Sequence, residues 1–338
     1  MTQELLVVED LVKTFPVRSR QLARRDVVGV QAVAGVSFAV DRGETFSIVG
    51  ESGSGKSTMA RCLVRIVEPT SGSIRFDGVE LADLDQRALR PLRHRFQMVF
   101  QDPMASLNPR QRAGDVIGEP LVLRGIDRST VAERVERVTR QVQLRPEDLD
   151  RFPHQFSGGQ RQRIGIARAL VLQPELVVLD EPVSALDVSV QAQIIRLLQQ
   201  LRDELGLAFV VIAHDLAVVR TLSHRVGVMY LGRLVEVGSV DQVYHDTLHP
   251  YSQALLSAAP IPDPDLERAR RRIVLTGDVP SPIDPPSGCR FRTRCWKATA
   301  ECIDQDPPLV DVDDGHLVAC HHAEQVDVIS RRTERTTA

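Results

Sequence analysis

The sequence has few aromatic side chains, no long apolar segment and almost no excess charge. Phe, Trp and Tyr make up 4% of its 338 residues, which disfavours a protein that binds nucleic acid by base stacking. The formal net charge of −3 gives no overall field that would attract nucleic acid or an anionic membrane. The longest apolar run, at 205–213, has the length of a strand, whereas a membrane-spanning helix needs about 20 residues. We therefore expect contact with a membrane only through partners.

The amino terminus also lacks the basic region and apolar core of a secretory signal, which predicts a cytoplasmic protein. Cysteine is scarce, with five residues in the chain. Cys62 stands alone within a predicted helix and is expected in the core. The other four cysteines gather near the end of the chain, and in a reducing compartment such a group indicates a metal site before it indicates disulfides.

What the sequence does contain is an alternation of strand and helix patterns. Apolar or alternating segments predict strands at 5–15, 33–40, 45–49, 176–180 and 208–213, and helical patterns occupy 56–66, 129–142, 160–172 and 189–204. Residues 17–28 are basic and predict a loop. This order indicates a doubly wound α/β core with a helical lobe inserted at about 103–172. The composition changes near residue 249, and the Pro-, Asp- and Arg-rich stretch at 260–286 predicts an extended tether.

Residues 50–57 read GESGSGKS and fit the phosphate-binding pattern G-x-x-x-x-G-K-[ST], between an apolar strand and a helix. Glycines let backbone N–H groups converge on a polyphosphate, and the helix N-terminus adds positive charge. Lys56 is expected to reach the β- and γ-phosphates, and Ser57 to ligate Mg²⁺. A chance glycine turn is the alternative. The residues predicted to bind nucleotide here are Gly50, Glu51, Ser52, Gly53, Ser54, Gly55, Lys56, Ser57 and Thr58.

A second site of charge follows the apolar strand LVVLD at 176–180. Asp180 at the end of this strand is placed to hold Mg²⁺ or its water, and Glu181 is predicted to be the general base that polarises an attacking water. A solvated acidic turn is the alternative. It does not explain two carboxylates at the end of a wholly apolar strand, where burial without a cation is costly.

The string FSGGQRQR at 156–163 resembles the LSGGQ signature of ABC ATPases, with Phe156 in place of leucine. In that family the signature of one subunit closes over ATP held by another, so that a head-to-tail dimer encloses two nucleotides. The resemblance therefore implies that Ser157, Gly158, Gly159 and Gln160 bind the nucleotide of a second subunit. A plain serine cap on a helix is the alternative for this segment.

Other short segments resemble further motifs of the same family. SALD at 184–187 is similar to the D-loop, which implies that Asp187 lies at the dimer interface. His214 resembles the switch histidine that contacts the γ-phosphate. Gln101 resembles the Q-loop glutamine, which touches Mg²⁺ or water and marks the joint to the helical lobe. Phe15 falls where the family places an aromatic ring against adenine, and a core phenylalanine is the alternative.

Several longer strings are similar to the oligopeptide/dipeptide importer ATPases, in particular to the F-type member of their unlike ATPase pair. These strings are FQDPMASLNPR at 100–110, EPVSALDVSVQAQ at 181–193, HPY at 249–251, PSPIDPPSGC at 280–289 and FRTRC at 291–295. The resemblance implies a P-loop ABC ATPase domain at 1–248, with a RecA-like lobe and an inserted helical lobe, followed by a small Cys-rich extension at 249–338.

The resemblance also implies the molecules that the chain works with. ATP and Mg²⁺ would be its cofactors. Its partners would be two membrane permease subunits, a sister ATPase that completes a heterodimer, and an extracytoplasmic peptide-binding protein. The chain would be a peripheral subunit on the cytoplasmic face of the membrane. A regulatory ABC ATPase without a permease, and an importer for nickel or glutathione, remain alternatives.

The four late cysteines are Cys289, Cys295, Cys302 and Cys320, with spacing C-x5-C-x6-C-x17-C. Four thiolates suit tetrahedral Zn²⁺ or an iron–sulfur cluster. The spacing contains no C-x2-C pair, which weakens the zinc interpretation. The resemblance implies a [4Fe–4S] cluster, and zinc or four metal-free cysteines stay open. We expect a structural role, because the cysteines lie far in sequence from the nucleotide motifs.

Overall fold

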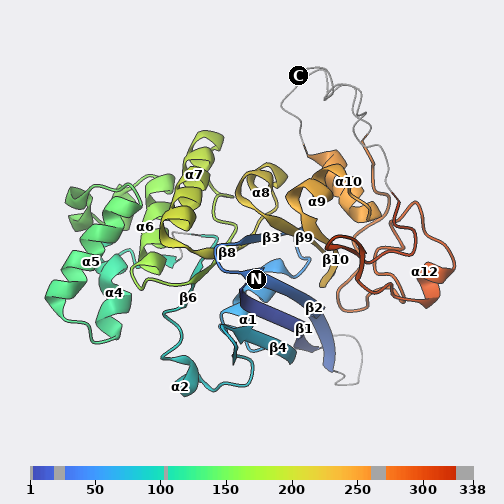
Figure 1. Cartoon of the computed structure of the whole chain (residues 1–338), viewed down its shortest axis with the longest axis horizontal. Coiled ribbons are helices and arrows are strands. Elements are labelled where there is room, and N and C mark those ends of the chain that lie inside the picture. The colour runs from blue at the N-terminus through green and yellow to red at the C-terminus, as the bar shows by residue number, and fades with distance from the viewer. Residues whose placement is uncertain (1–2, 19–26, 103–105, 260–271, 325–338) are drawn as a thin grey trace.

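The structure, a computed structural model, describes residues 3–18, 27–102, 106–259 and 272–324. Figure 1 shows a cluster of helices that contains α4, α5 and α6 at one end of the molecule, and the C-terminal segments with α12 at the other end. The strands lie between these two ends. The predicted α/β fold is confirmed, because parallel strands alternate with helices through this central part.

The main sheet has eight strands in the order β11-β12-β10-β9-β3-β8-β7-β6. Its five strands from β9 to β6 are parallel, and β10, β12 and β11 add to them antiparallel. Every residue of β3, β7 and β8 is buried, as expected for parallel strands that are covered on both faces. The bounds are β3 Thr45–Val49, β6 Phe96–Val99, β7 Leu176–Asp180, β8 Ala208–Ile212, β9 Arg225–Tyr230, β10 Arg233–Ser239, β11 Val310–Asp313 and β12 His316–Val318.

A second, antiparallel sheet has the order β2-β1-β4-β5. Its strands are β1 Glu4–Arg18, β2 Val27–Asp41, β4 Ser71–Phe76 and β5 Val79–Glu80. The prediction of a loop over 17–28 is wrong at both ends, since Val17 pairs with Val28 and Arg18 with Val27. The hairpin continues there because cross-strand backbone bonds form whatever the charge of the side chains. Residues 19–26 lie outside the described part.

The core lies on both faces of the main sheet. Val177 and Leu179 of β7 point into one apolar cluster with the helices of the lobe. Leu176 and Val178 point into another cluster with α1, β1 and β2. Successive side chains of a strand alternate between faces, so one strand supplies both clusters. Both faces of β7 are thereby fixed by packing.

The four predicted helices are present as α1, α5, α6 and α7. The helix predicted at 56–66 ends earlier, at Leu63. Arg65 adopts a left-handed backbone (φ 54°) and donates to the carbonyls of Leu81 and Leu84, so tertiary hydrogen bonds replace the next helical turn. The elements are α1 Lys56–Leu63, α2 Gln86–Leu89, α4 Ala113–Leu123, α5 Arg128–Gln141, η1 Pro146–Asp150, η2 Pro153–Gln155, α6 Gly158–Leu170, α7 Val188–Leu205, α8 Leu216–Leu222, α9 Val240–His245, α10 Pro250–Ala258 and α12 Glu301–Asp304.

The segment after residue 249 is joined to the main sheet through β12. Glu236 of β10 pairs with Val318 of β12, and the buried Glu236 carboxylate also contacts His316 Nε2 at 2.9 Å. Residues 272–286 contain no helix or strand, and 260–271, the first part of the predicted tether, lie outside the described residues. Within the described part of the chain, no helix combines the length and apolar character that crossing a bilayer requires.

Candidate functional site

The loop at 50–57 connects β3 to α1, as the phosphate-binding pattern requires. Two of its glycines have close backbone neighbours: a Cβ at Gly50 would lie 2.1 Å from the Met229 carbonyl oxygen, and one at Gly55 2.0 Å from that of Ala32. Any side chain there would displace the loop. The N-terminus of α1 has no side-chain cap and no acidic residue in its first turn. Its N–H groups are therefore disposed to bind an anion.

Lys56 is held inside this loop. Its Nζ donates to the carbonyl oxygens of Gly50 and Glu51, both at 2.8 Å, and to Ser54 Oγ at 3.3 Å. Burial lowers the pKa of Lys56, while the carboxylates of Glu181, Asp180 and Glu51 act against that shift. A buried ammonium among neutral oxygens favours an anion within reach.

Ser57 and Asp180 form an oxygen-rich pair next to the loop. Ser57 Oγ donates to Asp180 Oδ1 at 2.8 Å. Asp180 is buried at the end of β7, and burial raises its pKa above the ordinary value although the Ser57 hydrogen bond lowers it. A hydroxyl and a carboxylate are the hard ligands that Mg²⁺ prefers. The donor chemistry of this pair therefore fits the predicted magnesium site.

Glu181 is shared by two of the other predicted residues. Its Oε2 accepts from Gln101 Nε2 at 2.8 Å and lies 3.3 Å from His214 Nδ1. Its backbone is left-handed (φ 48°), a strained state for a non-glycine residue that is common at functional sites. Gln101, Glu181 and His214 follow β6, β7 and β8, whose carboxyl ends meet at one edge of the sheet. Parallel order thus brings three separate motifs together.

The signature segment lies elsewhere in the molecule. Ser157 is exposed, and it caps α6: its Oγ accepts from Gln160 N at 3.3 Å, and its own N donates to Gln160 Oε1 at 3.0 Å. Gly158, Gly159 and Gln160 form the first turn of α6. Figure 1 places α6 in the helical cluster, whereas α1 lies with the strands. Asp187 is likewise exposed and caps α7 through Val190 N at 2.9 Å.

The remaining predicted residues are Phe15, the tip of the phosphate loop and Cys62. Phe15 is not a core side chain: it is 37% exposed, and Lys13 Nζ lies 4.9 Å from its ring centre. Ser52 and Gly53 are exposed at the tip of the loop, and Thr58 is half-buried in α1. An exposed ring keeps a stacking role open for Phe15. Cys62 is buried, as predicted.

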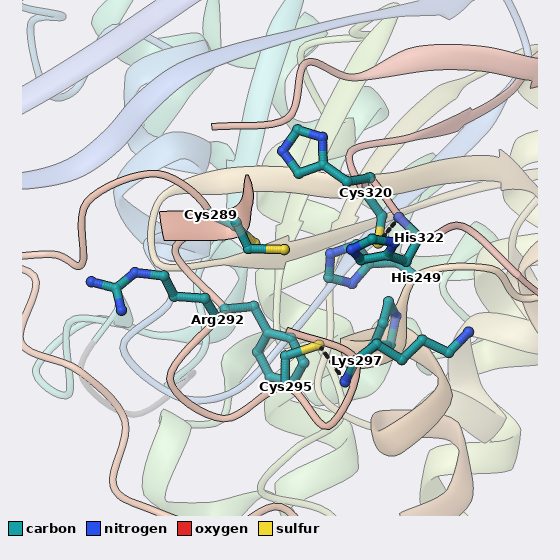
Figure 2. A pocket seen from close by; sticks show the side chains of 11 residues that line it. His249, Cys289, Arg292, Cys295, Lys297, Cys320 and His322 are labelled. Atoms are coloured by element: carbon teal, nitrogen blue, oxygen red, sulfur yellow. Dashed lines mark hydrogen bonds between the residues drawn. The ribbon is translucent and has the colours of Figure 1, made fainter. Parts of the chain in front are cut away.

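The four late cysteines line one pocket, together with His249 and Phe291. Figure 2 shows the sulfur atoms of Cys289, Cys295 and Cys320 turned toward the same space. Backbone N–H groups donate to two sulfurs, from Lys297 to Cys295 at 3.4 Å and from His322 to Cys320 at 3.3 Å.

These four thiols are free. Burial raises the pKa values of Cys289, Cys295 and Cys320, that of Cys289 to about 11. Sulfur donors with backbone N–H bonds are suitable chemistry for a soft metal centre. However, within the described residues no three His, Cys, Asp or Glu side chains are placed as a metal-binding group.

Sequence reasoning missed two contacts to the phosphate loop. Arg294 makes a two-pronged ion pair with Glu51, with Nη1 to Oε2 at 2.9 Å and Nη2 to Oε1 at 3.2 Å. The Glu51 backbone N donates to Tyr251 Oη at 2.8 Å. The strings at 249–251 and 291–295 contain both partners. They are distinctive in the sequence, but nothing local connects them with residue 51.

Two family models match this chain. One, described as ABC transporter, matches residues 33–184, and one, described as oligopeptide/dipeptide transporter, C-terminal region, matches 235–302. The oligopeptide transport ATP-binding protein OppF of Salmonella typhimurium is 50% identical over 319 residues, 94% of this chain and 95% of that protein. The oligopeptide transport ATP-binding protein AppF of Bacillus subtilis is 50% identical over 323 residues, 94% of this chain and 97% of that protein.

Solved structures with the same fold include two transporter cassettes. The post-hydrolysis dimer of the ATP-binding cassette MJ0796, bound to ADP and Pi, has a TM-score of 0.61 at 29% identity, and the match covers 70% of this chain and 98% of that one. CbiO1 from Clostridium perfringens, part of the ABC transporter complex cbiONQ, has a TM-score of 0.63 at 28% identity over 72% of this chain and 92% of that one.

Proposed function

The chain belongs to the ATP-binding proteins of oligopeptide-type ABC transporters, and we propose that the side chains at the carboxyl ends of β6, β7 and β8 are its ATP-hydrolysing centre. Such a protein is an ATPase that energises a peptide importer. The observation that carries the assignment is the Glu181 carboxylate, which is held by Gln101 and His214 beside the Ser57–Asp180 pair.

The phosphate loop positions the substrate. Lys56 would leave the loop carbonyls to pair with the β- and γ-phosphates, and backbone N–H groups of the loop and of the first turn of α1 would surround them. Ser57 and Asp180 would hold Mg²⁺. Gln101, which donates to Glu181, the residue after Asp180, would contact the ion or its water. The ion supplies charge neutralisation for the transferred phosphate. Phe15, with its exposed ring, would stack on adenine.

Hydrolysis needs a water aimed at the γ-phosphate, and Glu181 is the residue that would orient it and accept its proton. Gln101 and His214 hold the Glu181 carboxylate in place. The carboxylate therefore needs little rearrangement when the water binds. His214 is 58% exposed on its side chain, so it is free to turn toward the γ-phosphate. Positioning and charge stabilisation carry most of a phosphoryl transfer, and these side chains supply both.

The site would be completed by a second ATPase subunit. Ser157 is exposed at the start of α6, away from α1, and Gly158, Gly159 and Gln160 follow it in the first turn. Asp187 is exposed before α7. A head-to-tail dimer with a sister ATPase would bring this helix start onto the nucleotide of the other subunit. The dimeric form of the similar cassette MJ0796 supports this arrangement.

We propose the rest of the assembly from the family. The ATPase domain would span 1–248, with its helical lobe at about 103–172, and the extension 249–338. Two permease subunits and an extracytoplasmic peptide-binding protein would complete the importer, with this chain peripheral on the cytoplasmic face. Gln101, at the joint to the lobe, would transmit the state of the nucleotide to the permease.

The cysteine pocket would hold a [4Fe–4S] cluster through Cys289, Cys295, Cys302 and Cys320. Support comes from the shared pocket and from the N–H groups aimed at two of the sulfurs. Iron and acid-labile sulfide should be measured in anaerobically purified protein, beside a variant with Cys295→Ser and Cys320→Ser. Bound zinc without iron would replace the cluster with a zinc site, and neither metal would leave a packed set of free thiols.

The test of function is ATP hydrolysis by this chain alone and after coexpression with candidate permease and sister ATPase genes, in detergent. We expect little activity alone and strong activity in the assembly, stimulated by the peptide-binding protein. Equal activity in both would show that no permease controls the enzyme and would favour a regulatory ATPase. Stimulation by a nickel- or glutathione-binding protein instead would assign nickel or glutathione as the cargo.

A further inference from the structure

Glu51 is the point where the segment after residue 249 reaches the phosphate loop. All three of its polar groups are engaged: its carboxylate by Arg294, its N–H by Tyr251 Oη and its carbonyl oxygen by Lys56 Nζ. The first two partners belong to the segment after residue 249, and the third is the lysine expected to bind phosphate. Glu51 is therefore the single residue that connects the extension to Lys56.

The ion pair between Arg294 and Glu51 is largely buried. The Arg294 side chain is 9% exposed and that of Glu51 is 30% exposed, so the pair is largely shielded from water. Two parallel N–H···O bonds fix the orientation as well as the distance between the two groups. Loss of one partner would leave the other charge unpaired and partly buried, which is costly.

The backbone around Arg294 is anchored by an aromatic cluster. The rings of Tyr230 in β9, Tyr251 in α10 and Phe291 are buried, with centroids 4.6 to 5.4 Å apart. Phe291 lies three residues before Arg294 and four before Cys295. The same short segment therefore packs on the sheet, contacts the phosphate loop and lines the cysteine pocket.

We propose that Arg294 is a positioning residue for nucleotide binding: its ion pair with Glu51 holds the phosphate loop in the shape that accepts ATP, so the cysteine-rich segment sets the affinity of the site. This rests on the proposed role of residues 50–58 in binding ATP. Arg294 acts by fixing Glu51, and through Glu51 the carbonyl oxygen that Lys56 contacts.

The experiment is a double-mutant cycle in the full chain with Arg294→Gln, Glu51→Gln and both together. A fluorescent ATP analogue reports the Kd, and steady-state hydrolysis in the assembled transporter separates KM from kcat. We expect each single variant to raise Kd and KM about tenfold, equal to about 1.4 kcal/mol, with kcat within about twofold. The double variant should be no weaker than the weaker single variant, since contacting partners are not additive.

Arg292→Gln is the matched control. Arg292 lies in the same segment but donates to Ser287 and has its guanidinium turned away from the sulfurs in Figure 2. Its Kd should equal that of the wild type. A rise as large as that of Arg294→Gln would mean that any change in this segment weakens binding, and it would overturn the specific role of the ion pair.

Two further variants keep the outcomes distinct. If Arg294→Gln does not fold, as judged by circular dichroism, Glu51→Gln tests the same pair without changing the extension, and a wild-type Kd there would overturn the proposal. Lys56→Gln tests the loop itself. If Lys56→Gln loses ATP while the ion-pair variants bind normally, only the role of Arg294 fails. If Lys56→Gln binds ATP as the wild type does, the proposed nucleotide site fails.

Discussion

The polar side chains at the carboxyl ends of the parallel strands lie in a different electrostatic environment from those at the amino ends. At the carboxyl ends, Asp180 is buried with a raised pKa and Glu181 has a left-handed backbone. At the amino ends of β6 and β7, Arg95 and Glu175 belong to a closed ion-pair network with Arg42 and Asp77.

The direction of the pKa shifts shows what this difference means. Hydrogen bonds from Arg95 are the main cause that lowers the pKa values of Asp77 and Glu175, so the network stabilises their charged forms. Burial disfavours the charged form of Asp180. One end of the strands therefore adds to folding stability, whereas the other holds a carboxylate whose charged form burial disfavours despite the Ser57 hydrogen bond.

The largest effect is expected from Glu181→Gln at the carboxyl end. Removing a general base lowers a rate by about 10² to 10⁴-fold, while the phosphate loop and Lys56 stay intact. We expect phosphate release to fall by this factor and the ATP affinity to persist, with the closed dimer trapped in gel filtration. Normal turnover in this variant would remove Glu181 from the role of base.

A smaller effect is expected from Asp180→Asn, which should raise the stability of the ligand-free protein instead of lowering it. The amide keeps a partner for Ser57 but removes the buried charge, so without nucleotide the free energy of unfolding should rise by on the order of 1 kcal/mol. Thermal unfolding with and without Mg-ATP measures it. The wild type should gain more from Mg-ATP than the variant, because ligand binding stabilises only the form that binds it. A less stable variant without ligand would contradict the difference between the two ends.

The smallest effect is expected from Arg95→Gln at the amino end. The acidic partners are about one third exposed, so solvent screening limits the loss to roughly 1 kcal/mol or less. The kcat per folded molecule should not change. Chemical denaturation at neutral pH measures the loss, and a fall in kcat with unchanged stability would break the comparison.

In acid, the difference in free energy of unfolding between Arg95→Gln and the wild type should disappear. Asp77 and Glu175 have lowered pKa values when folded, so their contribution is present above their unfolded values of 3.8 and 4.5. It is lost as the pH falls through the lower folded values. The two unfolding free energies should therefore converge below about pH 4.

The comparison also separates what could be predicted from what could not. The central strands β3 and β7, the phosphate loop and the Asp180–Glu181 pair follow from local patterns, because a strand of buried apolar residues and a glycine turn are encoded over a few residues. The end of α1 at Leu63 could not be predicted, since it depends on Arg65 reaching the Leu81 and Leu84 carbonyls. The continuation of β1 and β2 through a basic segment depends likewise on cross-strand pairing.

The sequence by itself determined the nucleotide motifs, their order and the presence of four late cysteines, because each is a short pattern with its own chemistry. Only the tertiary structure decided which patterns meet. Gln101, Glu181 and His214 share one carboxylate because β6, β7 and β8 are neighbours, while Ser157 remains on a separate helix. Arg294 reaches Glu51 across 243 residues because the extension folds back on the sheet, where β12 pairs with β10 and Phe291 packs on Tyr230 of β9, the strand beside β3. Such contacts depend on strand order, which no local pattern contains.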